Sequence, residues 1–63
     1  MYDFLFELTE YSENEGEQIL CEAESYRSAL TILCWQYGFK REELKYLNRM
    51  SIEEGEWLGL DTY

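Results

Sequence analysis

Apolar and polar residues alternate along the start of the chain, and this pattern constrains the fold more than any other feature of the sequence. In an extended chain, Tyr2, Phe4, Phe6 and Leu8 lie on one side of residues 2–9. Asp3, Leu5, Glu7 and Thr9 lie on the other side. Alternation with a period of two residues is typical of a strand with one buried face. The segment therefore predicts a half-buried β-strand.

The same alternation returns at residues 17–24. The inward set is Ile19, Cys21 and Ala23, and the outward set is Gln18, Leu20, Glu22 and Glu24. Residues 12–16 between the two segments are Ser, Glu, Asn, Glu and Gly, which favour turns, so we expect a β-hairpin. If both apolar sets share one face, the numbers of paired residues must add up to an odd number, because a one-residue slip turns a whole strand over.

A helix is predicted at residues 26–37. Ser25 suits the N-cap position, and Gly38 suits the position after the helix because glycine adopts positive φ easily. A helical wheel places one set of residues on the face expected to pack on the hairpin: Tyr26, Ala29, Leu30, Leu33 and Tyr37. Ile32 and Trp35 lie on the opposite side, so something else must cover this second apolar face.

Residues 40–50 fit two structures. Strong helix formers favour a helix, and alternation favours a strand. Such a strand would have Leu44, Tyr46 and Met50 on one side and Lys45, Leu47 and Arg49 on the other. A two-stranded sheet is barely stable alone, which favours a third strand around residues 45–50. The sequence alone leaves both alternatives open.

The run Ser-Ile-Glu-Glu at residues 51–54 is a capping-box pattern, in which the first and last side chains accept hydrogen bonds from each other's backbone amides. It predicts a short C-terminal helix that ends at Gly59. The residues expected to cover the second face of the central helix are Trp57, Leu58 and Leu60. The predicted fold is a single α+β domain over residues 1–63, with the element order ββαβα.

The chain has 63 residues, so its hydrophobic core is necessarily small. A domain of this size buries only about 60% of the surface that its unfolded chain exposes. Eleven aromatic residues supply large apolar side chains, which we expect to fill most of the core. Oligomerisation is another remedy for a small core, so a homodimer is an alternative role. Its predicted seam consists of Ile32, Trp35, Trp57 and Leu58.

The residue types that catalysis uses most often are missing. The sequence has no histidine, which removes Ser-His and Cys-His pairs and the common zinc sites. Its four glycines are scattered, so there is no phosphate-binding loop. Catalysis by paired carboxylates needs a cleft that desolvates one of them, and a chain this short has little volume for one. We therefore expect no enzymatic activity, no cofactor and no bound metal.

Cys21 falls on the inward side of the second predicted strand, and Cys34 on the flank of the predicted helix. We expect both to be reduced thiols that pack in the core. The N-terminal residues include no basic region and no long apolar stretch, so we expect neither a signal peptide nor a membrane span. The expected location is the cytoplasm.

The net charge of −9 is unevenly distributed. Residues 1–24 hold eight acids and no base, residues 25–50 five bases and two acids, and residues 51–63 four acids and no base. Such a charge repels nucleic acid and anionic membranes and favours basic partners. The central bases Lys40, Arg41, Lys45 and Arg49 are expected to pair with acids of the chain itself, so we do not expect direct binding of nucleic acid.

The outward face of the predicted hairpin is the predicted binding site. Its residues are Asp3, Leu5, Glu7, Leu20, Glu22 and Glu24. Carboxylates around a small apolar centre suit a basic partner surface. The predicted function is therefore a non-enzymatic protein-interaction module that binds a basic protein surface. An alternative is a nucleic-acid mimic, since small acidic inhibitors carried by phages and mobile elements resemble the chain in size and charge.

Overall fold

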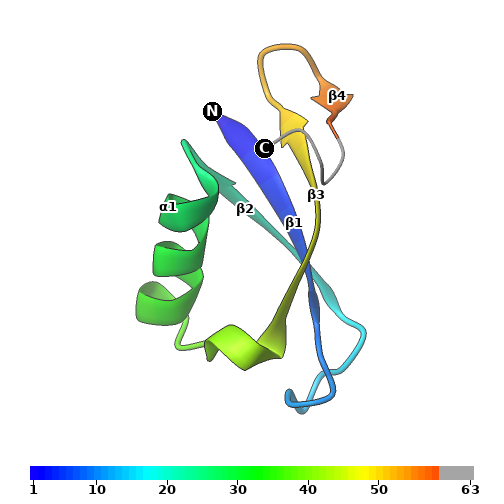
Figure 1. Ribbon diagram of the computed structural model, residues 1–63, viewed down its shortest axis with the longest axis vertical. Helices are drawn as coiled ribbons and strands as arrows, with labels where there is room; N and C mark the ends of the chain where they lie inside the picture. The colour runs from blue at the N-terminus through cyan, green and yellow to red at the C-terminus, as the bar shows by residue number, and fades with distance from the viewer. Residues whose placement is uncertain (59–63) are drawn as a thin grey trace.

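Four antiparallel strands form one sheet, and a helix packs on one of its faces (Figure 1). The computed structural model describes residues 1–58. The strands are β1 (Tyr2–Leu8), β2 (Gln18–Ala23), β3 (Leu44–Ser51) and β4 (Glu56–Trp57), in the spatial order β2-β1-β3-β4. The helical segment α1 (Tyr26–Thr31) continues into η1 (Ile32–Gln36), and the short η2 (Arg41–Glu43) precedes β3. The predicted α+β class is confirmed.

The β1–β2 hairpin has the register that the alternation requires. Tyr2 lies opposite Ala23 and Glu7 opposite Gln18, so the numbers of paired residues add up to 25, an odd number. At the loop, Gly16 adopts a φ of +88° and its amide donates to the Leu8 carbonyl at 2.8 Å. A left-handed backbone of this kind is easily adopted only by glycine. Both apolar sets consequently face the helix.

The core lies between the sheet and the helix. Its buried residues are Phe4, Phe6, Leu8, Cys21, Ala23, Ala29, Leu33 and Leu44. Tyr26 of α1 and Tyr46 of β3 pack against it with ring centroids 4.9 Å apart, and the Phe6 ring lies 5.7 Å from that of Tyr46. Aromatic rings therefore build the centre of the core, as predicted. Trp35 and Tyr11, however, are 85% and 68% exposed, so a part of the aromatic surface remains outside.

The helix begins and ends where predicted, with Tyr37 as its C-cap and Gly38 at positive φ, but its last turn has a different geometry. Ser25 caps it, because its Oγ accepts a hydrogen bond from the Ser28 amide at 3.2 Å. The final turns at Ile32–Gln36 are π-helical and wider than an α-helix, so the helical wheel fails there. Ile32 packs against the core instead of facing away, and Tyr37, which was expected on the sheet, lies at the C-cap and is 67% exposed.

Residues 44–51 form the third strand, which decides between the two alternatives at residues 40–50. The register of β3 against β1 shifts between Leu5 and Phe6, so Leu47 is an extra residue in a β-bulge. The bulge reverses the expected sides of the residues that follow. Arg49 lies on the helix side, with its guanidinium carbon 4.6 Å from the centroid of the Tyr2 ring, and Met50 faces the other side with Asp3.

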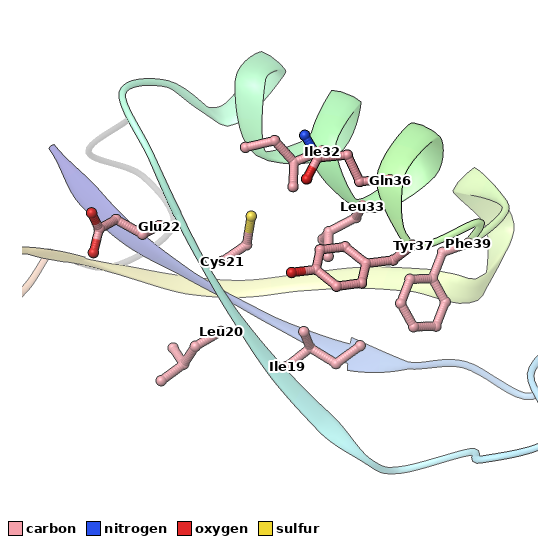
Figure 2. A pocket seen from close by; sticks show the side chains of 9 residues that line it. All are labelled: Ile19, Leu20, Cys21, Glu22, Ile32, Leu33, Gln36, Tyr37 and Phe39. Atoms are coloured by element: carbon pink, nitrogen blue, oxygen red, sulfur yellow. The ribbon is translucent and has the colours of Figure 1, made fainter.

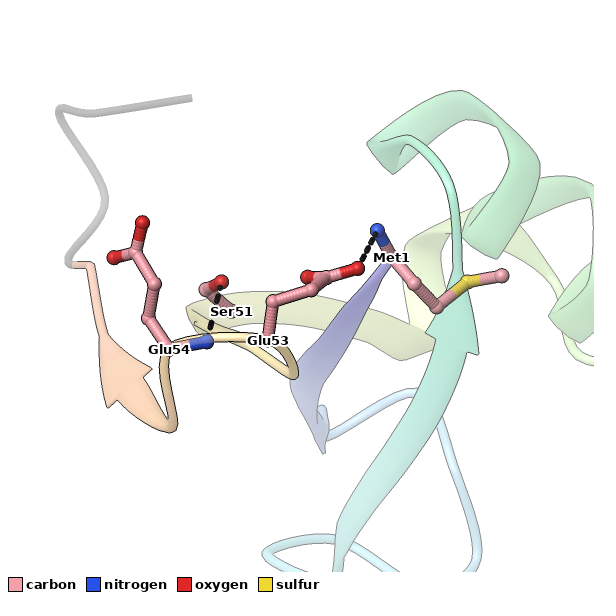
Figure 3. A network of polar contacts seen from close by, with 4 residues as sticks. All are labelled: Met1, Ser51, Glu53 and Glu54. Carbon is pink, nitrogen blue, oxygen red and sulfur yellow. Dashed lines mark hydrogen bonds and ion pairs between the residues drawn. The ribbon is translucent and has the colours of Figure 1, made fainter.

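The predicted C-terminal helix is wrong. One of the two hydrogen bonds expected of the capping box forms: the Glu54 amide donates to Ser51 Oγ at 3.3 Å (Figure 3). Gly55 then adopts a φ of +69°, which turns the chain back so that Met50 pairs with Trp57 in the β3–β4 hairpin. The Met1 ammonium contacts the Glu53 carboxylate at 3.2 Å beside this turn. The expectations for Gly59 and Leu60 lie outside the described residues.

Candidate functional site

The sheet has one face that no helix covers within residues 1–58. We call it the outer face, because α1 and η1 pack on the other one. Strand alternation and the observed register place the following residues on it: Asp3, Leu5 and Glu7 of β1, Gln18, Leu20 and Glu22 of β2, Lys45, Asn48 and Met50 of β3, and Trp57 of β4. Five of the six predicted binding residues therefore share one surface.

Two leucines form the centre of the outer face. Leu5 lies directly opposite Leu20 of β2 and opposite Asn48 of β3. Leu20 is 57% exposed, and Leu5 is half-buried between its neighbours. An exposed leucine alone is ordinary, but two leucines paired across neighbouring strands make a continuous apolar area.

A pair of like charges lies next to the two leucines. Asp3 faces Glu22 across the β1–β2 pair. The Leu8 amide donates to the Glu17 carbonyl at 2.8 Å, and hydrogen-bonded pairs alternate with non-hydrogen-bonded pairs along an antiparallel ladder. Asp3–Glu22 and Leu5–Leu20 are therefore non-hydrogen-bonded pairs, in which opposing side chains come closest. The fold thus holds two carboxylates close together beside an apolar surface.

The other end of the outer face has mixed charge. Glu7 lies between Gln18 of β2 and Lys45 of β3 in the register. Opposite charges on facing residues offset each other, so this end attracts cations less than the Asp3–Glu22 end does. Glu24, the remaining predicted binding residue, lies beyond the end of β2 and is exposed in the turn to α1. The structure therefore separates the acids by position, which the sequence pattern alone did not.

Sequence reasoning missed the part of the outer face that the second hairpin adds. Met50 pairs with Asp3 on one side and with Trp57 on the other. Trp57 is 48% exposed, so this row continues the apolar surface past the acidic pair. The bulge at Leu47 and the turn at Gly55 produce this arrangement. A glycine four residues after Ser51 was the one sequence signal that could have indicated the turn.

The predicted dimer seam does not form a single surface. Ile32 packs against the core, and Trp35 is 85% exposed on η1. Trp57 lies on β4, at the sheet edge opposite β2, while α1 contacts β2 (Figure 1). Leu58 is half-buried, and its amide donates to the Arg49 carbonyl at 2.8 Å. The C-terminal residues through Leu58 therefore leave Trp35 uncovered.

Cys21 and Cys34 are free thiols. Cys21 is buried in the core, and this burial raises the pKa of its thiol, with a further contribution from the negative charge of Asp3. Its Sγ lies 3.9 Å from the Ala29 carbonyl oxygen. In the described part of the chain, no three His, Cys, Asp or Glu side chains form a group that could hold a metal ion. The outer face presents apolar area, carboxylates and one lysine.

Comparison of the chain with protein families, with curated proteins and with solved structures finds no match. No helix among residues 1–58 is long and apolar enough to cross a membrane.

Proposed function

We propose that this protein is a non-enzymatic interaction module whose outer face binds a basic surface of a partner protein. The observation that carries the proposal is the placement of the Asp3–Glu22 pair directly beside the Leu5–Leu20 pair. An apolar centre with a charged border is the usual anatomy of a protein interface. The two free thiols suit a reducing compartment, so we propose the cytoplasm as its location.

Electrostatics favour a cationic partner at this surface. Like charges on directly opposed residues destabilise a strand pair, and a Lys or Arg of a partner placed between Asp3 and Glu22 would remove that repulsion. The net charge of −9 would also accelerate the approach of a basic protein over a distance of several ångströms. Binding would then bury Leu5 and Leu20. Burial of apolar surface stabilises a complex by about 25 cal/mol for each Å² removed from water.

The partner's identity distinguishes this role from the nucleic-acid mimic. A mimic would use the same carboxylates to enter the basic channel of a DNA- or RNA-handling enzyme. The spacing of acids on the outer face favours a compact protein interface instead, because Lys45 interrupts the row of carboxylates opposite Glu7. A long and unbroken acidic stripe would be needed to follow the phosphates of a duplex.

Affinity capture from an extract of the native host tests the proposal. The bait is the tagged chain, compared with the Leu5→Asp/Leu20→Asp variant, which places charges in the apolar centre. The matched control is Tyr11→Asp/Ile52→Asp, which adds the same two charges at exposed apolar positions outside the strands, 68% and 39% exposed in the parent. We expect a basic protein to be retained by the parent and by the control, and lost by the outer-face variant.

Two checks keep this experiment decisive. Circular dichroism and thermal unfolding of each bait show whether it is folded, and Leu20→Asp alone replaces the double variant if Leu5→Asp unfolds the sheet. Equal retention by the outer-face variant and the control would contradict the proposal. Capture of proteins without a basic surface would contradict it as well.

A further inference from the structure

β2 is at one edge of the sheet, and its outer backbone edge pairs with no strand within residues 1–58. Glu17 of the hairpin is hydrogen-bonded to Leu8, and along an antiparallel pair every second residue forms such bonds. The backbone amides and carbonyls of Ile19 and Cys21 therefore point toward β1. The amides and carbonyls of Gln18, Leu20 and Glu22 therefore point outward. These groups form a row of donors and acceptors that can accept another strand.

This edge has little of the protection that edge strands usually carry. Prolines, bulges, very short strands and several charges normally prevent an edge from pairing with another chain. β2 has six residues, no proline and an unbroken register with β1. Glu22 is its one charged residue.

An apolar hollow of about 550 Å³ opens beside the same edge (Figure 2). Its lining residues are Ile19, Leu20, Cys21 and Glu22 of β2, Ile32, Leu33 and Gln36 of η1, and Tyr37 and Phe39 after the helix. Gly38, at a φ of +78°, turns the chain after the helix, and the Phe39 amide donates to the Leu33 carbonyl at 3.1 Å. In Figure 2 the Cys21, Leu33 and Phe39 side chains lie on the helix side of β2, and Leu20 lies on the other side.

A strand added antiparallel to β2 would place its side chains in two different environments. Residues opposite Ile19 and Cys21 would direct their side chains to the helix side and into the hollow. Residues opposite Gln18, Leu20 and Glu22 would direct theirs to the outer face, next to the acidic pair. The edge thus fits a segment in which apolar residues alternate with residues suited to a carboxylate surface.

Charge selects the occupant of this edge. Residues 15–24 include four acids, namely Glu15, Glu17, Glu22 and Glu24, and no base. A second copy of the chain would bring the same acids next to them, whereas a segment with Lys and Arg would neutralise them. Charge complementarity therefore favours a basic segment of another protein over self-association.

We propose that the outer edge of β2 binds an extended basic segment of the partner as an antiparallel fifth strand, with its apolar side chains in the hollow. Its alternating Lys and Arg side chains lie on the outer face, beside Glu22 and the next row of carboxylates. The inference rests on the proposed function for the basic character of the partner. It adds the partner's conformation and a second contact surface that the outer face alone does not supply.

A short synthetic peptide tests the edge directly. The probe is acetyl-Lys-Val-Arg-Ile-Lys-Val-Arg-amide, and its control has the same residues with the bases and the apolar residues in separate blocks. Amide hydrogen exchange is followed by NMR in the intact chain. Without peptide, we expect fast exchange at Gln18, Leu20 and Glu22 and slow exchange at Ile19 and Cys21. The alternating peptide should slow the three fast amides by about tenfold or more, and the block peptide should not.

N-methylated peptides give a second, matched comparison. Methylation of the amides of the basic residues removes the donors that face β2, and methylation of the apolar residues' amides leaves those donors intact. We expect the first peptide to bind about tenfold or more weakly than the second.

Three results would overturn the inference. In the first, peptide signals appear at Leu5 and Met50 while exchange at Gln18, Leu20 and Glu22 is unchanged; this result removes the edge and leaves the outer-face proposal intact. In the second, the block and alternating peptides bind equally. In the third, the Gln18, Leu20 and Glu22 amides exchange slowly even without peptide, and light scattering gives the mass of a dimer. A second copy of the chain would then occupy the edge. Failure of the outer-face proposal is recognised separately, by unchanged capture with the Leu5→Asp/Leu20→Asp variant.

Discussion

Asp3 and Glu22 show how a residue pair can contribute to binding while it costs stability. They face each other at a non-hydrogen-bonded position of the β1–β2 pair, where two carboxylates repel each other. The neighbouring Leu5–Leu20 pair occupies the same kind of position. Proteins tolerate such costs where the residues serve a function.

Neutralising either carboxylate of this pair should stabilise the free protein. We expect Asp3→Asn or Glu22→Gln to raise the free energy of unfolding by about 0.2–1 kcal/mol, because each removes the repulsion across the strands. Urea unfolding measures the change, and Glu13→Gln in the exposed hairpin loop controls for the smaller net charge. Equal stabilisation by the loop variant would show that total charge, and not the facing pair, causes the effect. A loss of stability in both strand variants would contradict the account.

Glu53 links the second hairpin to the start of β1. Its carboxylate pKa is lowered, first by a hydrogen bond from its own backbone amide and then by the Met1 ammonium, which lies 3.2 Å away. A carboxyl group whose pKa is lower in the folded state stabilises the fold above its unfolded pKa of about 4.3, and this contribution disappears as the pH falls through the folded pKa.

The stability difference between the parent and Glu53→Gln should therefore depend on pH. We expect the variant to unfold at a lower urea concentration at neutral pH, and the two proteins to converge as the pH falls through the lowered folded-state pKa of Glu53. Unfolding curves at several pH values measure this convergence. Glu54→Gln, which removes a neighbouring charge that does not contact Met1, should give a smaller difference at neutral pH. A Glu53→Gln difference that is constant from pH 7 to about pH 3 would be inconsistent with the ion pair.

Among the elements, the turn at residues 52–55 determines whether the chain after β3 continues as a helix or returns as the strand β4. The Gly55 amide donates to the Ser51 carbonyl at 2.7 Å, as in one turn of a helix. The positive φ of Gly55 then ends that turn and allows β4 to pair with β3. The capping pattern at Ser51 therefore predicts a local hydrogen bond that forms, whereas the helix that it also predicts is replaced by a turn and β4.

Substitution of Gly55 should loosen β4. A residue with a Cβ atom in this left-handed conformation costs about 1–2 kcal/mol, and open space around the position excludes a steric clash as the cause. We expect Gly55→Ala to lower the free energy of unfolding by about 1 kcal/mol and Gly55→Asn by less, because asparagine tolerates this conformation better. Chemical shifts of Met50 and Trp57 report the loss of pairing. A Gly55→Ala variant as stable as the parent would mean that β4 contributes little.

The elements also show what a single sequence can predict. Alternation in residues 2–8 and 18–23 is regular, so the hairpin and the odd sum of its paired residue numbers followed from it directly, whereas the sum of 25 comes from the structure. The bulge at Leu47 has no comparable signal in the sequence. It exchanges the sheet faces expected for Arg49 and Met50 without changing the composition of β3. The π-helical turn likewise displaces Ile32 and Tyr37 from the positions that a regular helix predicts.

At the scale of the whole molecule, the β1–β2 hairpin contributes seven of the 14 acids, and the sheet arranges those on its strands. Sequence reasoning predicted which residues of β1 and β2 share the outer face, since that needs only the alternation of two strands. It could not predict that Lys45 lies opposite Glu7, or that Met50 and Trp57 extend the surface, because these neighbours depend on pairing between segments far apart in the chain. Long-range register is therefore the information that the pattern lacks.

Binding of the captured partner by two variants of equal net charge tests the central claim most directly. One variant is Asp3→Asn/Glu7→Gln/Glu22→Gln on the outer face, and the other is Glu10→Gln/Glu13→Gln/Glu54→Gln in the turns. Calorimetry at low salt and at about 0.5 M salt, where the Debye length is only a few ångströms, measures both affinity and its electrostatic part. We predict that the outer-face variant binds about tenfold or more weakly and loses most of the salt dependence, while the turn variant stays close to the parent. Equal weakening of the two variants would show that total charge, and not the arrangement on the sheet, recruits the partner.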